Sequence, residues 1–480
     1  MEESVVVLLP GLALLFLGLL LRLFRLRVAA AVGRLGAVIW RQLGARLHFP
    51  LDHSERPQLI SKPSALARYL LQHCGSLARP SLVPWPWSDP HIQTLHSQAW
   101  PVGDSSGEVS FARDLLELRD GGVVALDWAV ATPRDQGKPR APSATPSILI
   151  VVPNCWGGLT LHVLRLCRLA LAQGFYPVVF HRRGQGGCPL VTPALQQFGD
   201  PADLIEAVSY IRCRHPSSAL VAVSEGSGAG LLLSYLGECG SSSYLKAAVC
   251  LSPIFHGQLW FETPLPPPYR WALLIYQKLQ LSRYATTLSS VMDVEAALRC
   301  SSLRDFEEAL FCSKGTGKAG GTEQPAPLDW EGYWEKNEPL RDVDEVAVPV
   351  LCLSSWDDPL RGDPRTSLPF DLFRSSPYFL LVLTGCGGHC GLGAGGRGEP
   401  CWSHAATLEY FRVVGEFLRA EERGGLGGGG LLPRRRTSTQ LPRRRRGTVL
   451  RRDRTTPTTA PPTDQPDLPD LFQWHRSYTR

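Results

Sequence analysis

The sequence predicts an α/β fold, in which helices cover both faces of a mostly parallel β-sheet. Between residues 122 and 251, short apolar segments alternate with helix-like segments, which is typical of a parallel sheet. Two further strand-like segments, at residues 348–354 and 378–383, resume the alternation after a long interruption. With 480 residues, 44% of them hydrophobic, the chain is long enough to bury a sizeable core.

The expected elements follow one another regularly along the chain. Strands buried on both faces are continuous apolar runs, and apolar residues three to four positions apart predict helices. We therefore expect strands at residues 122–130, 147–152, 176–180, 220–223 and 247–251, and helices at 159–171, 201–213 and 227–236. A last helix at 405–422 would complete a domain that spans residues 111–422.

Three other segments have a different composition. Residues 252–334 contain mainly helical, aromatic-containing stretches and a flexible loop at 315–327, which predicts a helical cap inserted over the sheet. Residues 35–110, rich in Pro, Trp and short polar turns, are expected to form an irregular N-terminal extension. Residues 423–480, rich in Gly, Arg, Pro and Thr, hold too little apolar content to fold alone and predict a disordered tail.

The positive net charge of +6 comes from this tail. Residues 424–480 contain twelve Arg, four Asp and no Lys or Glu, which gives +8 and leaves about −2 for the rest. The folded part therefore has no basic face for nucleic acid. The thirteen cysteines form no C-x-x-C pair, which favours buried free thiols in a reducing compartment. We expect neither a metal nor a cofactor.

The first 34 residues contain an apolar segment with asymmetric flanking charges. Residues 5–21 are uninterruptedly apolar, with Glu2 and Glu3 before them and Arg22 and further arginines after them. These 17 residues match a short membrane-spanning helix. The charges predict a single-pass anchor, in the endoplasmic reticulum or a related membrane, with the large domain in the cytosol. The alternative is a cleaved secretory signal with Ala29-Ala30-Ala31 near the cleavage site, and a secreted protein.

Three motifs carry possible catalytic chemistry. The strand at 220–223 and the helix at 227–236 meet in a tight turn, Asp357-Asp358-Pro359 follows the strand at 348–354, and Gly387-Gly388-His389 follows the strand at 378–383. A turn for the nucleophile, then an acid, then a histidine is the chain order of α/β-hydrolase catalytic triads. The order predicts a charge relay in which an aspartate orients His389.

The nucleophile turn departs from its usual pattern. The pattern is G-x-S-x-G, whereas this chain has Ser224-Glu225-Gly226-Ser227-Gly228, with the first and third letters exchanged. The reactive position therefore holds Gly226. Use of Ser224 would shift the hydroxyl by two positions and use of Ser227 by one. A displacement of roughly 1 Å already costs about a hundredfold in rate.

Over residues 61–422 the chain resembles the lipid-esterase group of the α/β-hydrolase-domain-containing proteins. The resemblance rests on the three motifs, on Pro90-His91-Ile92-Gln93-Thr94-Leu95 and on His181-Arg182-Arg183-Gly184. It implies an α/β-hydrolase fold and a role in lipid chemistry. It also implies that the family's serine falls on Gly226, its acid on Asp358, with Asp357 as the alternative, and its histidine on His389. The family's His-Gly oxyanion turn is replaced here by Pro153-Asn154-Cys155-Trp156-Gly157-Gly158.

Together these features predict a regulatory pseudoenzyme in lipid metabolism, which controls lipid breakdown by binding. An acyl or lipid ligand, a membrane and a regulatory protein are the expected partners. The alternative is an active serine carboxylesterase or lipase that uses Ser224 or Ser227 with Asp358 and His389. In the tail, Ser438 and Thr448 follow paired arginines and are candidate phosphorylation sites, and the arginine runs suit anionic lipid.

Overall fold

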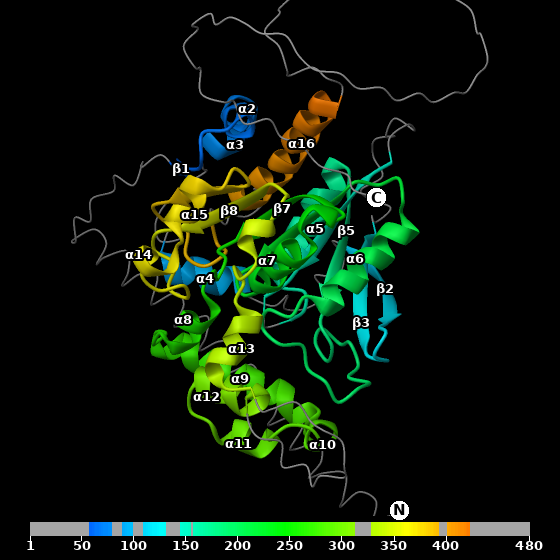
Figure 1. Ribbon diagram of the computed structural model, residues 1–480, viewed down its shortest axis with the longest axis vertical. Helices are drawn as coiled ribbons and strands as arrows, with labels where there is room; N and C mark the ends of the chain where they lie inside the picture. The colour runs from blue at the N-terminus through cyan, green and yellow to red at the C-terminus, as the bar shows by residue number, and fades with distance from the viewer. Residues whose placement is uncertain are drawn as a thin grey trace, which may run out of the picture. The chain divides into compact units, whose positions relative to one another are not determined.

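A single mixed β-sheet forms the centre of the molecule (Figure 1). The structure, a computed structural model, describes residues 57–78, 89–98, 109–130, 145–154, 157–312, 328–392 and 401–422. Within these ranges nine strands are joined in the order β1-β9-β8-β7-β6-β4-β5-β3-β2. The strands are β1 (Gln58–Ile60), β2 (Ser110–Glu117), β3 (Val123–Val130), β4 (Ser147–Val152), β5 (Phe175–His181), β6 (Leu220–Glu225), β7 (Leu245–Leu251), β8 (Val350–Ser355) and β9 (Phe379–Thr384).

The six strands from β4 to β9 are parallel to one another, and the antiparallel pairs lie toward the two edges of the sheet. Successive side chains of a strand point to opposite faces. In β4, accordingly, Leu149 and Val151 belong to one hydrophobic core, and Ile148 and Ile150 belong to the other. The α/β class expected from the sequence is confirmed.

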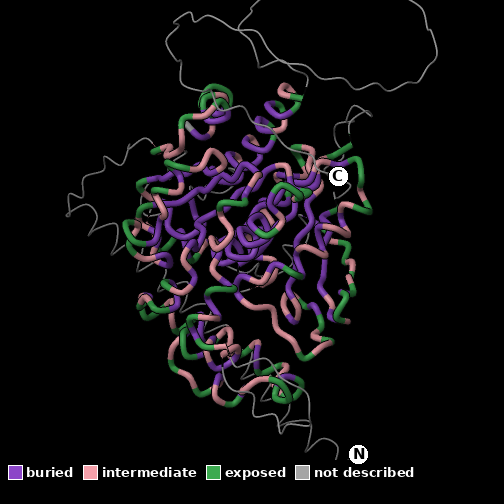
Figure 2. Tube along the Cα trace, in the orientation of Figure 1, coloured by how far each residue is buried: buried purple, intermediate pink, exposed green. Residues whose placement is uncertain are grey.

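Helices cover both faces of the sheet. The first core contains side chains of α2 (Ala65–His73), α5 (Leu161–Gln173) and α16 (Trp402–Glu422), with the short α3 (Gly75–Ala78) packed against α16. The second core contains side chains of α6 (Ala202–Arg214), α7 (Gly228–Cys239) and α15 (Phe370–Ser375). Figure 2 shows the central strands and α7 as an almost continuously buried centre.

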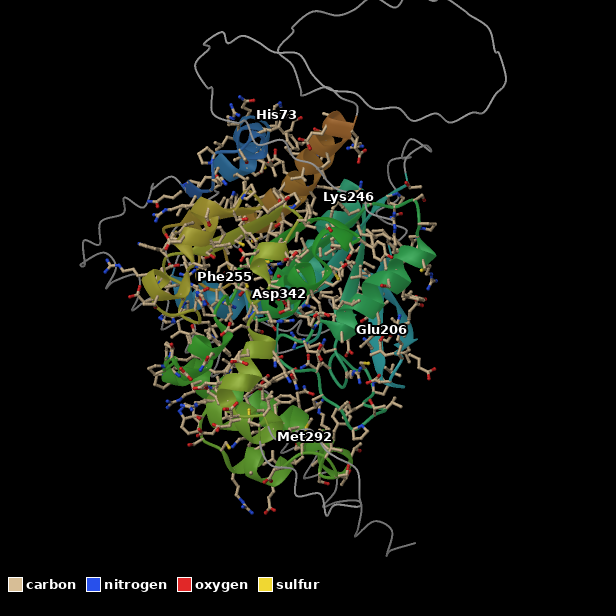
Figure 3. The ribbon with its side chains drawn as sticks, in the orientation of Figure 1. His73, Glu206, Lys246, Phe255, Met292 and Asp342 are labelled. Atoms are coloured by element: carbon tan, nitrogen blue, oxygen red, sulfur yellow. The ribbon has the colours of Figure 1, made fainter. Side chains whose placement is uncertain are left out.

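A group of helices between β7 and β8 forms a cap with a core of its own. Phe255 lies where the chain leaves the sheet, and Met292 lies among the cap helices (Figure 3). Trp260, Trp334 and Phe198, the last from the body of the domain, meet in the cap core. The cap helices are α8 (Gly257–Glu262), α9 (Pro267–Arg283), α10 (Ala285–Leu288), α11 (Val294–Arg299), α12 (Leu303–Phe311) and α13 (Trp330–Asn337).

The N-terminal extension differs from the expectation of irregular chain. Its described part contains β1, α2, α3 and α4 (Pro90–Gln98). Gln58 in β1 pairs antiparallel with Leu383 in β9, and α2 contacts α16. These elements therefore belong to the same domain, which includes residues before 111. The edge strand β2 was also missed, because its half-exposed sequence mixes charged and apolar residues.

Several predictions fall on parts of the chain outside the described residues. These are the apolar segment 5–21, the tail 423–480 with Ser438 and Thr448, and Cys155-Trp156 in the turn after β4. Within the described residues, no helix is both long enough and apolar enough to cross a membrane. Short elements complete the fold: α14 (Pro364–Ser367) and two 3-10 turns, Gly240–Ser242 and Val343–Glu345.

Candidate functional site

The turn between β6 and α7 has the geometry of a nucleophile elbow. Gly226 has a φ of +51°, in the left-handed region where glycine is unstrained. Its N–H donates a hydrogen bond of 2.9 Å to the carbonyl of Leu251 in β7. A Cβ on Gly228 would lie 2.4 Å from the carbonyl oxygen of Pro153, so a glycine is needed where α7 approaches the end of β4. Gly228 thus fills the role of the last glycine of G-x-S-x-G, and Gly226 stands at the nucleophile position.

His389 and Asp358 form a buried pair at the ends of β9 and β8. The Nδ1 atom of His389 lies 2.9 Å from Oδ2 and 3.1 Å from Oδ1 of Asp358. Both residues are 4% exposed. Asp358 Oδ1 also accepts hydrogen bonds from the backbone N–H groups of Leu360 and Arg361. The carboxylate is therefore fixed by the backbone on one side and orients the imidazole on the other.

The two charges of this pair stabilise each other. Burial by itself would lower the pKa of His389, but the negative charge of Asp358 outweighs burial, and the pKa lies well above its ordinary value. Burial would raise the pKa of Asp358, but the charge of His389 and the hydrogen bond from it hold this pKa below its ordinary value. A buried imidazolium–carboxylate ion pair results.

Residues around the pair hold the loop that carries His389. Asp357 accepts the N–H of Gly388 at 3.0 Å, so its oxygen is engaged with the backbone of this loop. On α4, Thr94 Oγ1 accepts the N–H of His389 at 2.9 Å, and Ser97 Oγ donates to the carbonyl of His389 at 2.8 Å. Sequence reasoning noted the Pro90–Leu95 motif but assigned it no role. The motif contains Thr94, and Ser97 follows it one turn later on the same helix, so two hydroxyl residues three positions apart were the available signal.

The imidazole closely approaches the empty nucleophile position. A Cβ built on Gly226 would lie 2.6 Å from Nε2 and 3.3 Å from Cε1 of His389. Nε2 of the histidine thus faces the position that the nucleophile occupies in a hydrolase of this fold. It also occupies space that a serine side chain needs, so a serine would fit only after the imidazole moved.

The two nearby serines lie on either side of this position in the chain. Ser224 sits inside β6, paired with Cys250 and Val152 in the neighbouring strands. Its side chain is fully buried, and its Oγ has no hydrogen-bond partner among the described residues. Ser227 is the buried N-cap residue of α7. Ser224 is thus fixed within the strand, and Ser227 is fixed in the turn directly before the helix.

An asparagine follows β4, where the resemblance implies a His-Gly turn. Asn154 donates from Nδ2 to Oε1 of Gln98 at the end of α4. Its Cβ would lie 3.6 Å from a Cβ on Gly226. The site therefore has α4 and Asn154 beside the elbow.

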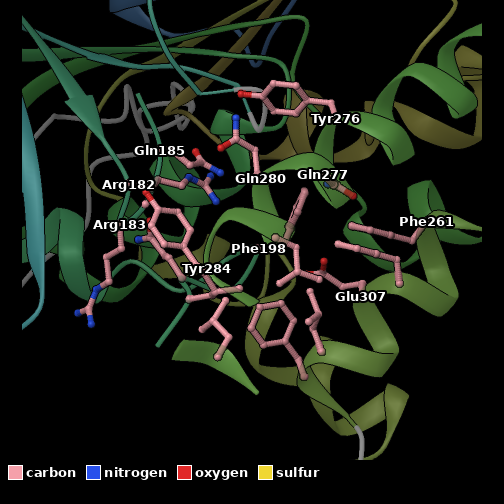
Figure 4. A pocket seen from close by; sticks show the side chains of 18 of the residues that line it. Arg182, Arg183, Gln185, Phe198, Phe261, Tyr276, Gln277, Gln280, Tyr284 and Glu307 are labelled. Atoms are coloured by element: carbon pink, nitrogen blue, oxygen red, sulfur yellow. The ribbon is translucent and has the colours of Figure 1, made fainter. Parts of the chain in front are cut away.

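A cavity of about 120 Å³ lies between the body and the cap (Figure 4). Phe198, Trp260 and Phe261 give it an aromatic wall, and polar groups reach it from the loop after β5 and from α9 and α12. Gly226 and His389 do not line it. The lining also includes Arg182, Gln185, Tyr276, Gln277, Gln280, Tyr284, Glu307 and Phe311.

Two polar side chains in this cavity are unusual. Burial raises the pKa of Glu307 to about 7, against the opposing hydrogen bond of 2.6 Å from the Tyr333 hydroxyl. Its carboxyl is therefore partly protonated near neutral pH. Gln277 Oε1 is buried without a hydrogen-bond partner in the described part of the chain. Such an acceptor can receive a hydrogen bond from a ligand.

Side-chain contacts hold the loop that follows β5. His181 Nε2 lies 2.9 Å from Asp127 in β3, and Arg183 contacts Asp203 on α6 at 2.6 Å. The motif His181-Arg182-Arg183-Gly184 thus anchors the loop. Gln185, next in the chain, lines both the cap cavity and a smaller space beside Asn154. The cavity and the space beside Asn154 therefore share Gln185 as a lining residue.

One group of side chains that could bind a metal ion lies next to Glu225, the residue before Gly226. Buried His162, Cys401 and His404 place one ligand atom each within 4.8 Å of one another. The sequence gave no sign of this cluster, because His162 and Cys401 are 239 residues apart.

Comparison with known proteins reveals close and distant relatives. The chain is 49% identical over 427 residues to "Protein ABHD15" of Homo sapiens, covering 88% of this chain and 85% of that protein. It is 27% identical over 376 residues to "Phospholipase ABHD3" of Bos taurus, covering 76% and 85%. A solved esterase of Pyrococcus furiosus is 12% identical, with a TM-score of 0.41, covering 66% of this chain and 96% of that one. No protein-family model matches the chain.

Proposed function

This chain belongs to the α/β-hydrolase-domain-containing protein family, and we propose that it is a pseudoenzyme that regulates lipid breakdown by binding. The observation that carries this proposal is the absence of a side chain at Gly226, where a Cβ would lie 2.6 Å from His389 Nε2. Acyl transfer in this fold begins with attack by the elbow nucleophile. With glycine there, the Asp358–His389 pair has no hydroxyl to activate at that position.

The aromatic cavity under the cap supports an acyl ligand. A cavity of about 150 Å³ lined by apolar side chains takes up benzene, so the roughly comparable volume here suits part of an acyl chain. The wall of Phe198, Trp260 and Phe261 supplies apolar contact, and Gln277 supplies a hydrogen-bond acceptor. The name of the bovine relative, a phospholipase, points to the same class of ligand.

Ligand binding is tested with a fluorescent fatty acid. Gln280 lines the cavity, and Leu279 beside it on α9 is 58% exposed. We expect Gln280→Trp to fill the cavity and weaken binding at least tenfold. Leu279→Trp, the matched control, should bind like the wild type. Equal binding by all three proteins would show that the fatty acid does not bind in this cavity.

The alternative function is that of an active serine carboxylesterase or lipase. The intact Asp358–His389 pair favours it, with Ser224 or Ser227 as the nucleophile. Labelling with a serine-directed fluorophosphonate, followed by peptide mass spectrometry, separates the two functions. The pseudoenzyme should show no labelled elbow serine and near-background hydrolysis of short-chain and long-chain esters. Robust labelling and turnover that vanish in Ser224→Ala or Ser227→Ala would establish the esterase.

We also propose that residues 5–21 anchor the protein in the endoplasmic reticulum or a related membrane, with the hydrolase domain in the cytosol. The arginines that follow this segment support that orientation. The chain should resist carbonate extraction. Recovery of a mature chain beginning near residue 32 in the medium would favour the secreted alternative.

The basic tail is proposed to bind a regulatory protein or an anionic membrane. Deletion of residues 424–480 should leave thermal stability unchanged but abolish recovery of protein partners or binding to anionic liposomes. Phosphorylation at Ser438 or Thr448 adds negative charge and should weaken either contact. If both contacts survived the deletion, the tail would not mediate them, and the regulatory proposal would rest on the cavity alone.

A further inference from the structure

Three buried side chains from distant parts of the chain converge on one face of the sheet. His162 lies near the start of α5, and Cys401 and His404 lie at the start of α16. One ligand atom from each residue lies within 4.8 Å of the other two. His162 is 5%, Cys401 4% and His404 1% exposed. Two imidazoles and a thiol so close together in the protein interior form a donor set that suits a transition metal.

Glu225 sets the orientation of the first histidine. Its Oε1 lies 2.6 Å from Nδ1 of His162, and both side chains are buried. The other ring nitrogen, Nε2, is thereby directed toward Cys401, with 3.9 Å between Nε2 and Sγ. In metal-bound histidines the second ring nitrogen commonly donates its N–H to a carboxylate in this way. This hydrogen bond fixes the orientation of the ring and makes it a better ligand.

His404 supplies an independent sign of a missing partner. Its Nε2 is buried and has no hydrogen-bond partner among the described residues. Its ring centroid is 4.0 Å from that of His162. A buried polar atom without a partner is unfavourable, and a metal ion bound by both rings would satisfy it.

The charges of the cluster balance a divalent cation. A metal-bound cysteine is a thiolate, and the Glu225 carboxylate adds a second negative charge. The two negative charges would neutralise a 2+ ion inside the protein.

We propose that His162, Cys401 and His404 bind a single zinc ion, with Glu225 as the carboxylate that orients His162. Tetrahedral zinc with Zn–N near 2.0–2.1 Å and Zn–S near 2.3 Å places its ligand atoms roughly 3.3–3.6 Å apart. The ligand atoms, which lie within 4.8 Å of one another, would come to these distances after side-chain shifts below about 1 Å. Three protein ligands leave a fourth position for water or for a shifted Glu225 oxygen.

A zinc ion at this site would stabilise the turn at Gly226 through Glu225. It joins α5 to α16, and Glu225 is the residue directly before Gly226. Zinc would thus hold the turn that faces His389 without contacting it. This inference is independent of the pseudoenzyme proposal, because neither the cavity nor the empty nucleophile position takes part.

The test measures metal in the full-length protein, expressed with zinc supplementation and purified without a polyhistidine tag or chelator. Elemental analysis should find about one zinc per chain. After removal of the zinc, added Co²⁺ should produce the intense thiolate-to-cobalt absorption that surface-bound Co²⁺ does not give. Zinc well below one equivalent in the wild type, together with no such absorption, overturns the proposal without any variant.

Variants then assign the ligands. Cys401→Ser should abolish the cobalt–thiolate absorption, and His404→Gln should lower zinc content at least tenfold. Glu225→Gln should weaken zinc binding roughly 10- to 100-fold. Cys167→Ala, which removes another buried thiol on the same helix as His162, should keep full zinc and the full absorption. An unchanged absorption in Cys401→Ser contradicts the assignment.

Discussion

The elbow and the cap differ in how much space they leave for a ligand. At the elbow, the Asp358–His389 pair is complete and buried, but a Cβ at the nucleophile position would overlap the imidazole. In the cap, aromatic side chains surround an open cavity of about 120 Å³. The space between Gly226 and His389 is thus closed, whereas the space under the cap is open. If the proposed function holds, ligand binding and turnover are separated in this fold, and the next four predictions test that separation.

The largest expected effect is on the cap core. Trp334 is 1% exposed and packs against Phe198, Phe261 and Gly257. Trp334→Ala should lower the free energy of unfolding by about 3–5 kcal/mol and abolish binding of the fatty-acid probe, as measured by urea denaturation and fluorescence. Trp271→Ala, at a side chain 52% exposed on α9, should change stability by less than about 0.5 kcal/mol. Probe binding that survives Trp334→Ala would place the ligand outside the cap.

The second effect is a dependence of stability on pH that originates in the cap. The pKa of Glu307 is raised from 4.5 to about 7, mainly by burial. Its neutral form is favoured on folding, so its contribution is full below about pH 4.5 and is lost as pH rises through about 7. The loss amounts to roughly 3 kcal/mol. In Glu307→Gln, unfolding measured from pH 4.5 to 8 should lose this slope.

The matched control for Glu307→Gln is Glu308→Gln, next to it on α12 and 45% exposed. It should keep the wild-type slope. If Glu307→Gln kept the slope as well, the carboxyl would be charged throughout this range, and the cavity would be far more polar than described.

The third effect tests whether the elbow can be repaired by one substitution. Gly226→Ser adds a Cβ next to His389 Nε2 at a φ of +51°. We expect a loss of about 1–3 kcal/mol from overpacking and backbone strain, with ester hydrolysis still near background. Gly415→Ala on α16, where a Cβ meets no atom closer than 3.8 Å, should leave stability unchanged or slightly raised. Substantial esterase activity in Gly226→Ser would show that the imidazole moves aside readily.

The smallest effect concerns the support of His389. Thr94→Val removes the hydroxyl that accepts the His389 N–H and should cost about 1 kcal/mol in chemical denaturation. Thr366→Val, at an exposed threonine on α14, is the control and should cost less. Equal costs would mean that α4 does not hold the histidine loop.

The elements that were predicted well are those whose pattern is local. Strand β4 matches residues 147–152 because every side chain after Ser147 is buried, so the sequence is continuously apolar from Ile148 on. The register of the elbow also follows from a local pattern, the glycines at Gly226 and Gly228 between the strand and the helix. Edge strand β2 lacked such a pattern. Contacts between distant segments, such as Thr94 with His389 or His162 with Cys401, leave no mark in either local sequence.

The two edges of the sheet limit how another chain can be recognised. At one edge, β1 is three residues long and covers β9. At the other edge, β2 carries Arg113, which contacts Asp127. Its neighbour Asp114 contacts Trp128 and Arg214. Short and charged edge strands discourage the addition of a foreign strand. We therefore expect a partner to contact side chains of this protein instead of extending its sheet.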